Sequence, residues 1–121
     1  MRSEPVNRTW LLLSLQRALV GAVPASLRAV TCDWTDTTIL LRQIFDGPID
    51  PGDEEAMRIV GTEVISDFPP EVALDEQIIR IDHPASLASH FLRAWAYMRK
   101  EGPTDPPYKP PGDVVAQAKS G

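Results

Sequence analysis

The chain of 121 residues has one cysteine and no long hydrophobic run. A single cysteine cannot close an internal disulfide, so Cys32 gives no sign of an oxidising compartment, and we expect a cytoplasmic protein. The apolar stretch after Trp10 is broken by Gln16 and Arg17, well short of the roughly 20 residues that a membrane span needs. We therefore predict an amphipathic first helix instead of a signal peptide or membrane anchor.

Motifs of the common enzyme and metal-binding classes are also absent. The sequence has no phosphate-binding loop, dinucleotide-binding glycine pattern or Gly-x-Ser-x-Gly elbow. Cys32 alternates with Val30 and Trp34 on a predicted strand, which favours a core position over a nucleophile paired with His83 or His90. The acidic segment 46–55 has prolines at its third and sixth positions, which an EF-hand loop excludes. We predict no catalytic residue, no metal site and no cofactor.

Charge is distributed unevenly along the chain. The net charge is −5, yet residues 46–82 carry eleven acidic residues and two basic ones, a local charge of −9. Such a field repels phosphate backbones and anionic lipid headgroups, so nucleic acid and membranes are poor partner candidates. A basic protein would be attracted to it.

Hydrophobic periodicity predicts an α+β domain. Helices are expected over residues 9–22 and 51–68, and strands over 27–34, 37–45, 72–82 and 91–99. The second helix has the clearest start, because Asp50 can cap it and Pro51 suits its first turn. The αββαββ order predicts a four-stranded antiparallel sheet with both helices on one face and the other face exposed.

The last strand and the C-terminal segment suggest two further surfaces. Alternation predicts that Arg93, Trp95, Tyr97 and Arg99 share the exposed sheet face, where they could form an interface or a homodimer contact, or merely cover the sheet. We assign residues 1–101 to a single domain and 102–121 to a flexible, proline-rich tail. A PxxP pattern at 107–110 is a weak signal for polyproline recognition.

Several short stretches together carry a family resemblance. They are Leu27-Arg28-Ala29-Val30-Thr31, Phe45-Asp46-Gly47, Thr62 to Pro69, Ile79-Arg80-Ile81-Asp82 and Tyr97-Met98-Arg99-Lys100-Glu101. Residues 10–101 thereby resemble small bacterial immunity proteins of contact-dependent-inhibition and related polymorphic toxin systems. The resemblance implies a protein that binds and neutralises a cognate toxin, and it transfers no individual site residue.

The resemblance and the charge pattern together predict a partner-binding surface. An acidic face would steer association with a basic toxin, such as a nuclease, and fill its cationic site. The residues expected to form that face are Asp53, Glu54, Glu55, Asp75 and Glu76. The alternative is a small enzyme or ligand-binding domain that uses the exposed sheet face or the loop over residues 82–90.

Overall fold

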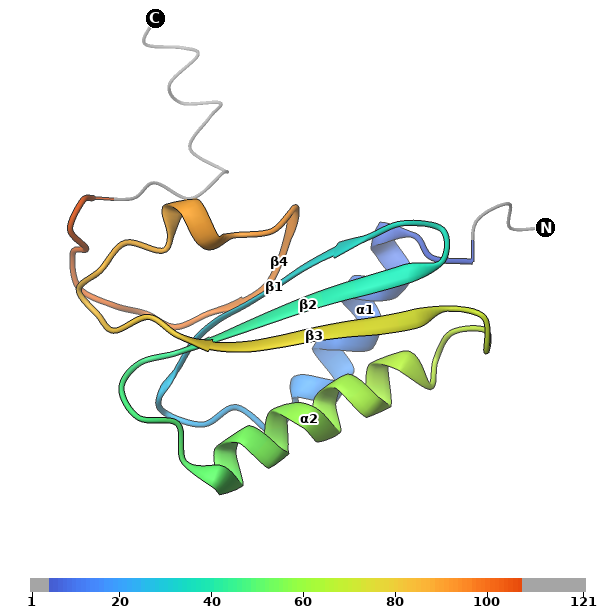
Figure 1. Ribbon diagram of the computed structural model, residues 1–121, viewed down its shortest axis with the longest axis horizontal. Coiled ribbons are helices and arrows are strands. Elements are labelled where there is room, and N and C mark those ends of the chain that lie inside the picture. The colour runs from blue at the N-terminus through green and yellow to red at the C-terminus, as the bar shows by residue number, and fades with distance from the viewer. Residues whose placement is uncertain (1–4, 108–121) are drawn as a thin grey trace, which may run out of the picture.

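The computed structural model describes residues 5–107 and contains two α-helices, four strands and one short 3₁₀ helix (Figure 1). In chain order the elements are α1 (Arg8–Leu19), β1 (Leu27–Trp34), β2 (Thr38–Phe45), α2 (Pro51–Ile65), β3 (Ala73–Arg80), η1 (Ala88–His90) and β4 (Ala94–Met98). The α+β class and the order of helices and strands are confirmed. Residues 108–121 of the predicted tail (102–121), which hold most of the PxxP pattern, lie outside the described residues.

Local capping explains where both helices begin. The Asn7 side chain accepts the backbone N–H of Trp10 at 2.9 Å at the start of α1. Asp50 accepts the N–H groups of Gly52 and Asp53 at the start of α2, and Pro51 occupies its first turn. These bonds satisfy backbone donors that have no partner within the helix, and they confirm the predicted start of the second helix.

The strand order is β3-β2-β1-β4. β1 is antiparallel to β2 and to β4, but β2 and β3 are parallel, so the prediction of a wholly antiparallel sheet is wrong. The reason is that α2 connects β2 to β3 and returns the chain to the end of the sheet where β2 began. A helical crossover of this kind joins parallel strands, whereas a tight hairpin joins antiparallel ones.

Both helices cover the same face of the sheet, as predicted, and the main core lies between them and the strands (Figure 1). Ile39, Leu41 and Phe45 all point into this core from β2. The helices contribute Leu11 and Leu15 of α1 and other fully buried side chains, including Met57, Val60 and Val64 of α2. Burial of these apolar side chains supplies the main driving force for this layer.

The opposite sheet face is partly covered, which corrects the expectation that it is exposed. Ala29, Ile44 and Leu87 form a second buried cluster, against which Ile79, Ile81 and Phe91 pack. The segment that carries η1 folds over this part of the sheet, because the Arg42 guanidinium donates to the carbonyl of His90 at 2.9 Å. Residues 82–90 were predicted as a loop, so the buried Leu87 was not anticipated, and the partly buried Phe91 precedes β4 instead of opening the last strand as predicted.

A bulge in β4 separates two aromatic residues that the alternation placed on one face. Val30 pairs with Tyr97 and the next residue, Thr31, pairs with Trp95, so Ala96 is an extra residue in β4. Tyr97 therefore packs against the main core. Trp95 lies on the other face, where its ring centroid is 4.0 Å from that of Phe91. The predicted shared face of Trp95 and Tyr97 is therefore wrong, while a homodimer contact through this strand stays a prediction.

A second bulge, in β1, places a fully buried arginine in the sheet. Leu27 pairs with Phe45 and Ala29 with Ile44, which leaves Arg28 as the extra residue. The Arg28 side chain is 0% exposed and donates to both carboxylate oxygens of Glu101, at 2.8 and 2.9 Å, and to the carbonyl of Ile81 at 2.8 Å. This buried ion pair connects β1 to the segment that follows β4.

Residues 102–107 contact the loop that follows β3. The backbone N–H of Asp105 donates to the carbonyl of Pro84 at 2.7 Å, and the N–H of Ser86 donates to the carbonyl of Asp105 at 3.3 Å. The first part of the segment predicted as a tail is therefore hydrogen-bonded to the domain.

Candidate functional site

Three of the predicted contact residues lie in the first turns of α2. Glu55 is exposed, whereas Asp53 and Glu54 are half-buried. Glu54 accepts a hydrogen bond from Arg58 at 2.6 Å, one helical turn later. Asp53 and Glu55 take part in no ion pair among residues 5–107.

The other two predicted residues, Asp75 and Glu76, lie on opposite faces of β3. Successive residues of a strand point to opposite sides of a sheet. Glu76 faces α2, where its carboxylate lies against Gly61, while Asp75 is exposed and lines a hollow with Asp33 and Trp34 on the other side. The structure thus brings Asp53, Glu54, Glu55 and Glu76 to the α2 side and leaves Asp75 apart.

Glu76 is the most enclosed of these acids. Its side chain is 12% exposed and its Oε1 lies 3.7 Å from a guanidinium nitrogen of Arg58. Burial raises the pKa of the Glu76 carboxyl, and the amide of Gln43 and the charge of Arg58 only partly oppose that rise. Glu76 Oε2 and Gln43 Oε1 are both buried without a hydrogen-bond partner in the described chain. We therefore regard Glu76 as a structural group and not as an open contact.

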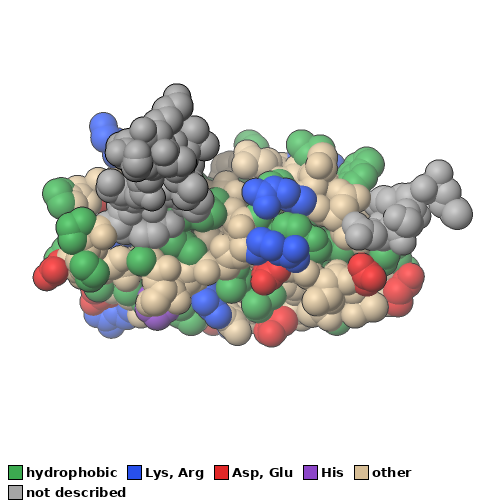
Figure 2. Space-filling view, turned by 90° about the horizontal axis from the view of Figure 1, so that it is seen from above, with side chains coloured by type: hydrophobic (Ala, Val, Ile, Leu, Met, Phe, Trp, Pro, Cys, Tyr) green, Lys and Arg blue, Asp and Glu red, His purple; other side chains and the backbone are tan. Residues whose placement is uncertain are grey.

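Acidic residues outnumber basic ones among the groups that form no ion pair. Within residues 5–107 these are eight acids and three bases. The acids are Asp36, Asp50, Asp53, Glu55, Glu63, Glu71, Asp75 and Asp105, and the bases are Arg8, Arg42 and Lys100. Figure 2 shows one face of the molecule, on which acidic side chains lie at several separate places and basic ones lie both near the middle and toward the left edge. The negative charge is therefore spread over the molecule.

The two predicted interface arginines of the last strand have partners within the chain. The Arg93 guanidinium lies 3.7 Å above the Trp34 ring and donates to Asp33 at 2.8 Å. Arg99 donates to Asp46 at 2.8 Å and to Glu101 at 2.9 Å, and is one-quarter exposed. Both side chains therefore hold neighbouring segments together.

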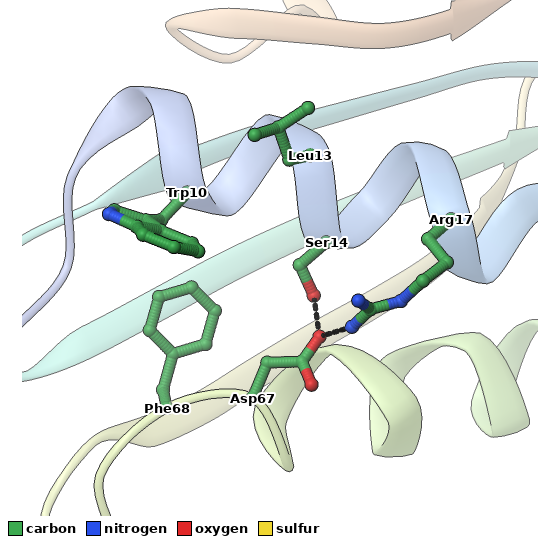
Figure 3. Close-up of a pocket in the computed structure, with 6 residues that line it drawn as sticks. All are labelled: Trp10, Leu13, Ser14, Arg17, Asp67 and Phe68. Atoms are coloured by element: carbon green, nitrogen blue, oxygen red, sulfur yellow. Dashed lines mark hydrogen bonds and ion pairs between the residues drawn. The ribbon is translucent and has the colours of Figure 1, made fainter.

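A groove lies between α1 and the end of α2 and has exposed apolar residues on its wall. It has a volume of about 480 Å³ and is lined by Trp10, Leu13, Ser14 and Arg17 of α1, with Asp67 and Phe68 beyond α2. Figure 3 shows Trp10 and Phe68 together at one end, and Ser14 and Arg17 converging on the carboxylate of Asp67 at the other. Ser14 donates to Asp67 at 2.6 Å, and Arg17 forms an ion pair with the same oxygen.

The groove was not predicted from the sequence, although the first helix carries a signal for it. Trp10 and Leu13 are 56% and 59% exposed, and Val20 is 81% exposed. Their spacing places these three residues with Arg17 on one side of the first helix, away from the buried stripe of Leu11 and Leu15. A second apolar stripe on a helix that already has a buried one is a mark of an interaction surface.

The candidate nucleophile Cys32 occupies a position in the core. Cys32 is fully buried, and burial raises the pKa of its thiol to about 12, which confirms the core interpretation. In residues 5–107 no three His, Cys, Asp or Glu side chains come together in a way that could hold a metal ion. None of the helices in that range is both long and apolar enough to span a bilayer.

Comparison with known proteins identifies a family. The family model described as MafI2 immunity protein matches residues 8–101. The match covers every helix and strand of the structure, from the first residue of α1 to Glu101, which pairs with the buried Arg28. No curated protein matches the chain.

Proposed function

Because the chain belongs to the MafI2 immunity protein family, we propose that it binds and neutralises a cognate toxin protein whose contact surface is basic. The family match over the whole folded domain is the observation that carries this proposal. Binding requires an accessible complementary surface and no reacting group, and the candidate nucleophile Cys32 is buried in the core. We place the encounter in the cytoplasm, where one unpaired cysteine is usual.

The charge of the chain supports a basic partner. The net charge is −5, and the acids without ion pairs exceed the bases without ion pairs in the described part. A field of this sign raises the association rate of a positively charged protein and slows that of competing anionic ones. Neutralisation then follows from occupying the cationic surface through which a toxin such as a nuclease holds its substrate.

Within that field, the exposed side of α2 is the surface that we propose for the acidic contact. Glu55 and Glu63 are both exposed and lie two turns apart on this side, whereas the half-buried Asp53 is two residues before Glu55 and points to another side of the helix. Neither Glu55 nor Glu63 is engaged in an ion pair with residues 5–107. An incoming basic side chain would therefore not have to displace an internal cation.

The test measures binding of the cognate toxin domain, held catalytically inactive, to the wild-type chain and to charge-reversal variants. Glu55→Lys should lower the association rate constant by roughly two- to fivefold, the scale of an exposed charge pair, and flatten its dependence on salt. Asp75→Lys is the matched control, because it makes the same change in net charge on the opposite sheet face.

The outcomes separate the parts of the proposal. No binding of the toxin domain by the wild-type chain would refute the function. Equal slowing by both variants would support a general charge effect and refute the specific α2 surface. An association rate that does not change with salt would refute the basic nature of the contact.

A further inference from the structure

We infer that the groove between α1 and the end of α2 is the docking site for the toxin, and that it receives an apolar side chain from a partner segment that also carries a basic residue. This inference rests on the proposed function and assigns the anchor of the interface. We call the surface the α1 groove and define it by Trp10, Leu13, Arg17, Asp67 and Phe68.

The composition of the α1 groove is that of an interface centre. Two large apolar side chains, Trp10 and Leu13, are more than half exposed, and Phe68 forms part of the wall beside them. Tryptophan and arginine are enriched among the few residues that contribute most of the binding free energy. The volume of about 480 Å³ falls within the range of roughly 300–1,000 Å³ over which proteins bury small ligands, so a large side chain has room to enter.

The wall of the groove is held in place before any partner arrives. Ser14 is buried and donates to Asp67, whose carboxylate also pairs with Arg17, so the connection that follows α2 is bonded to α1 (Figure 3). A surface fixed in this way loses little conformational entropy on binding. Leu13 takes no part in these bonds, and its side chain is 59% exposed.

Charge around the α1 groove favours a basic partner over a second copy of the chain. Glu63 lies one helical turn before Asp67, and Glu71 lies three residues after Phe68. Both acids are exposed, and within residues 5–107 neither has an ion-pair partner. A basic residue next to the inserted apolar side chain would meet these carboxylates. Two copies of the chain would instead bring equal acidic rims together, which is unfavourable.

The experiment compares two exposed apolar residues on different elements. Leu13→Ala should weaken the binding of the inactive toxin domain by about fivefold or more, mainly through faster dissociation, as expected for an interface anchor. Leu13→Arg should weaken it further, because it places a positive charge in the groove. Met98→Ala is the matched control, since Met98 is 36% exposed on β4 and lies outside both the groove lining and α2, and its affinity should stay within about twofold of the wild type.

Circular dichroism and urea unfolding of each variant establish that the fold is intact. If the wild type binds the toxin and both Leu13 variants bind equally well, the docking site is refuted while the proposed function stands. If the wild type does not bind the toxin, the proposed function fails first. A wild type that dimerises in a sizing measurement, together with a monomeric Leu13→Arg, would assign the groove to a second copy and overturn the inference.

Discussion

Replacing Glu101 with glutamine should destabilise the domain severely, because it removes the counterion of a buried guanidinium. The Arg28 side chain is 0% exposed and that of Glu101 is 7% exposed, and two hydrogen bonds join them. Removing one partner of a buried ion pair leaves the other charge uncompensated in a medium of low polarity, at a cost of about 3–5 kcal/mol. Such a loss is a large fraction of the roughly 5–15 kcal/mol that stabilises a typical domain.

Urea unfolding at pH 7 measures this effect. With a loss of about 4 kcal/mol and an m value of about 2 kcal/mol per molar, the midpoint of Glu101→Gln should fall by about 2 M. Glu54→Gln serves as a control, because it removes one carboxylate from an exposed pair with Arg58. Isolated surface pairs contribute little to stability, so its midpoint should stay close to that of the wild type.

The pH dependence provides an independent check with a defined sign. Burial alone would raise the pKa of the Glu101 carboxyl, but the hydrogen bonds and charges of Arg28 and Arg99 outweigh it and lower the pKa below its ordinary value of 4.5. The unfolded chain then binds a proton before the native state does, so stability is lost as the pH falls from 4.5 through the native pKa. The difference between the wild type and Glu101→Gln should shrink over that interval.

A second pair of variants tests the role of Arg28 itself. Arg28→Met combined with Glu101→Leu removes both charges, so the loss should be smaller than the sum of the two single losses. A Glu101→Gln midpoint equal to that of Glu54→Gln, or a difference that does not change between pH 7 and pH 3, would refute the reasoning.

Three further changes have defined outcomes. Glu76→Gln should stabilise the domain by about 1 kcal/mol at pH 7 in thermal or urea unfolding, because a neutral amide can donate to the orphan oxygen of Gln43. Since burial raises the pKa of Glu76, wild-type stability should also fall as the pH rises above 4.5 through that pKa, and this fall should be absent from the variant. Gly61→Ala should destabilise by about 1 kcal/mol despite the better helix propensity of alanine, because its Cβ would overlap the Glu76 carboxylate, and the same change should become stabilising in a Glu76→Ala background. Ser14→Ala should cost about 1 kcal/mol through the lost bond to Asp67, and an unchanged midpoint would contradict the bonded wall of the α1 groove.

The features that follow from neighbouring residues were predictable from the sequence. The start of α2 depends on Asp50 and Pro51, whose preferences act within one turn. The antiparallel pairing of β1 with β2 follows from the short turn between them, and alternation identified the core-facing residues of β2. These predictions needed no information about distant parts of the chain.

The features that depend on distant contacts were not predictable in the same way. The parallel pairing of β2 and β3 follows from the crossover through α2, so the predicted element order was compatible with it, but the position of β3 beside β2 is set by packing across the sheet. The bulge at Ala96 shifts the alternation of β4 by one residue, so a period of two assigns Trp95 and Tyr97 to the same face. The bulge at Arg28 lies at the start of β1, so the alternation of Val30, Cys32 and Trp34 after it was predicted correctly. Arg28 in particular has the residue type of a surface position.

The candidate site also has one part that was predictable from the sequence and one part that was not. The acidic character of α2 is visible in the sequence, and Asp53 and Glu54 lie in its first turn, followed by Glu55. Asp75 and Glu76 are also adjacent in the chain, but a strand turns neighbours away from each other, so charge counted along the sequence overstates the charge of any one face. The α1 groove joins residues about fifty positions apart, such as Ser14 and Asp67, and only the folded chain shows their contact.

The extra residue at Ala96 gives β4 two aromatic anchors that hold different layers of the molecule. Deleting Ala96 would reverse the face to which the residues on one side of the deletion point. Either the Tyr97 or the Trp95 side chain would then lose its packing. A shortened strand of this kind would not simply lose a small side chain. β4 would no longer pack at once against the side of the sheet that carries η1 and against the side that carries α1 and α2. The number of residues in this edge strand therefore matters more to the fold than their identity.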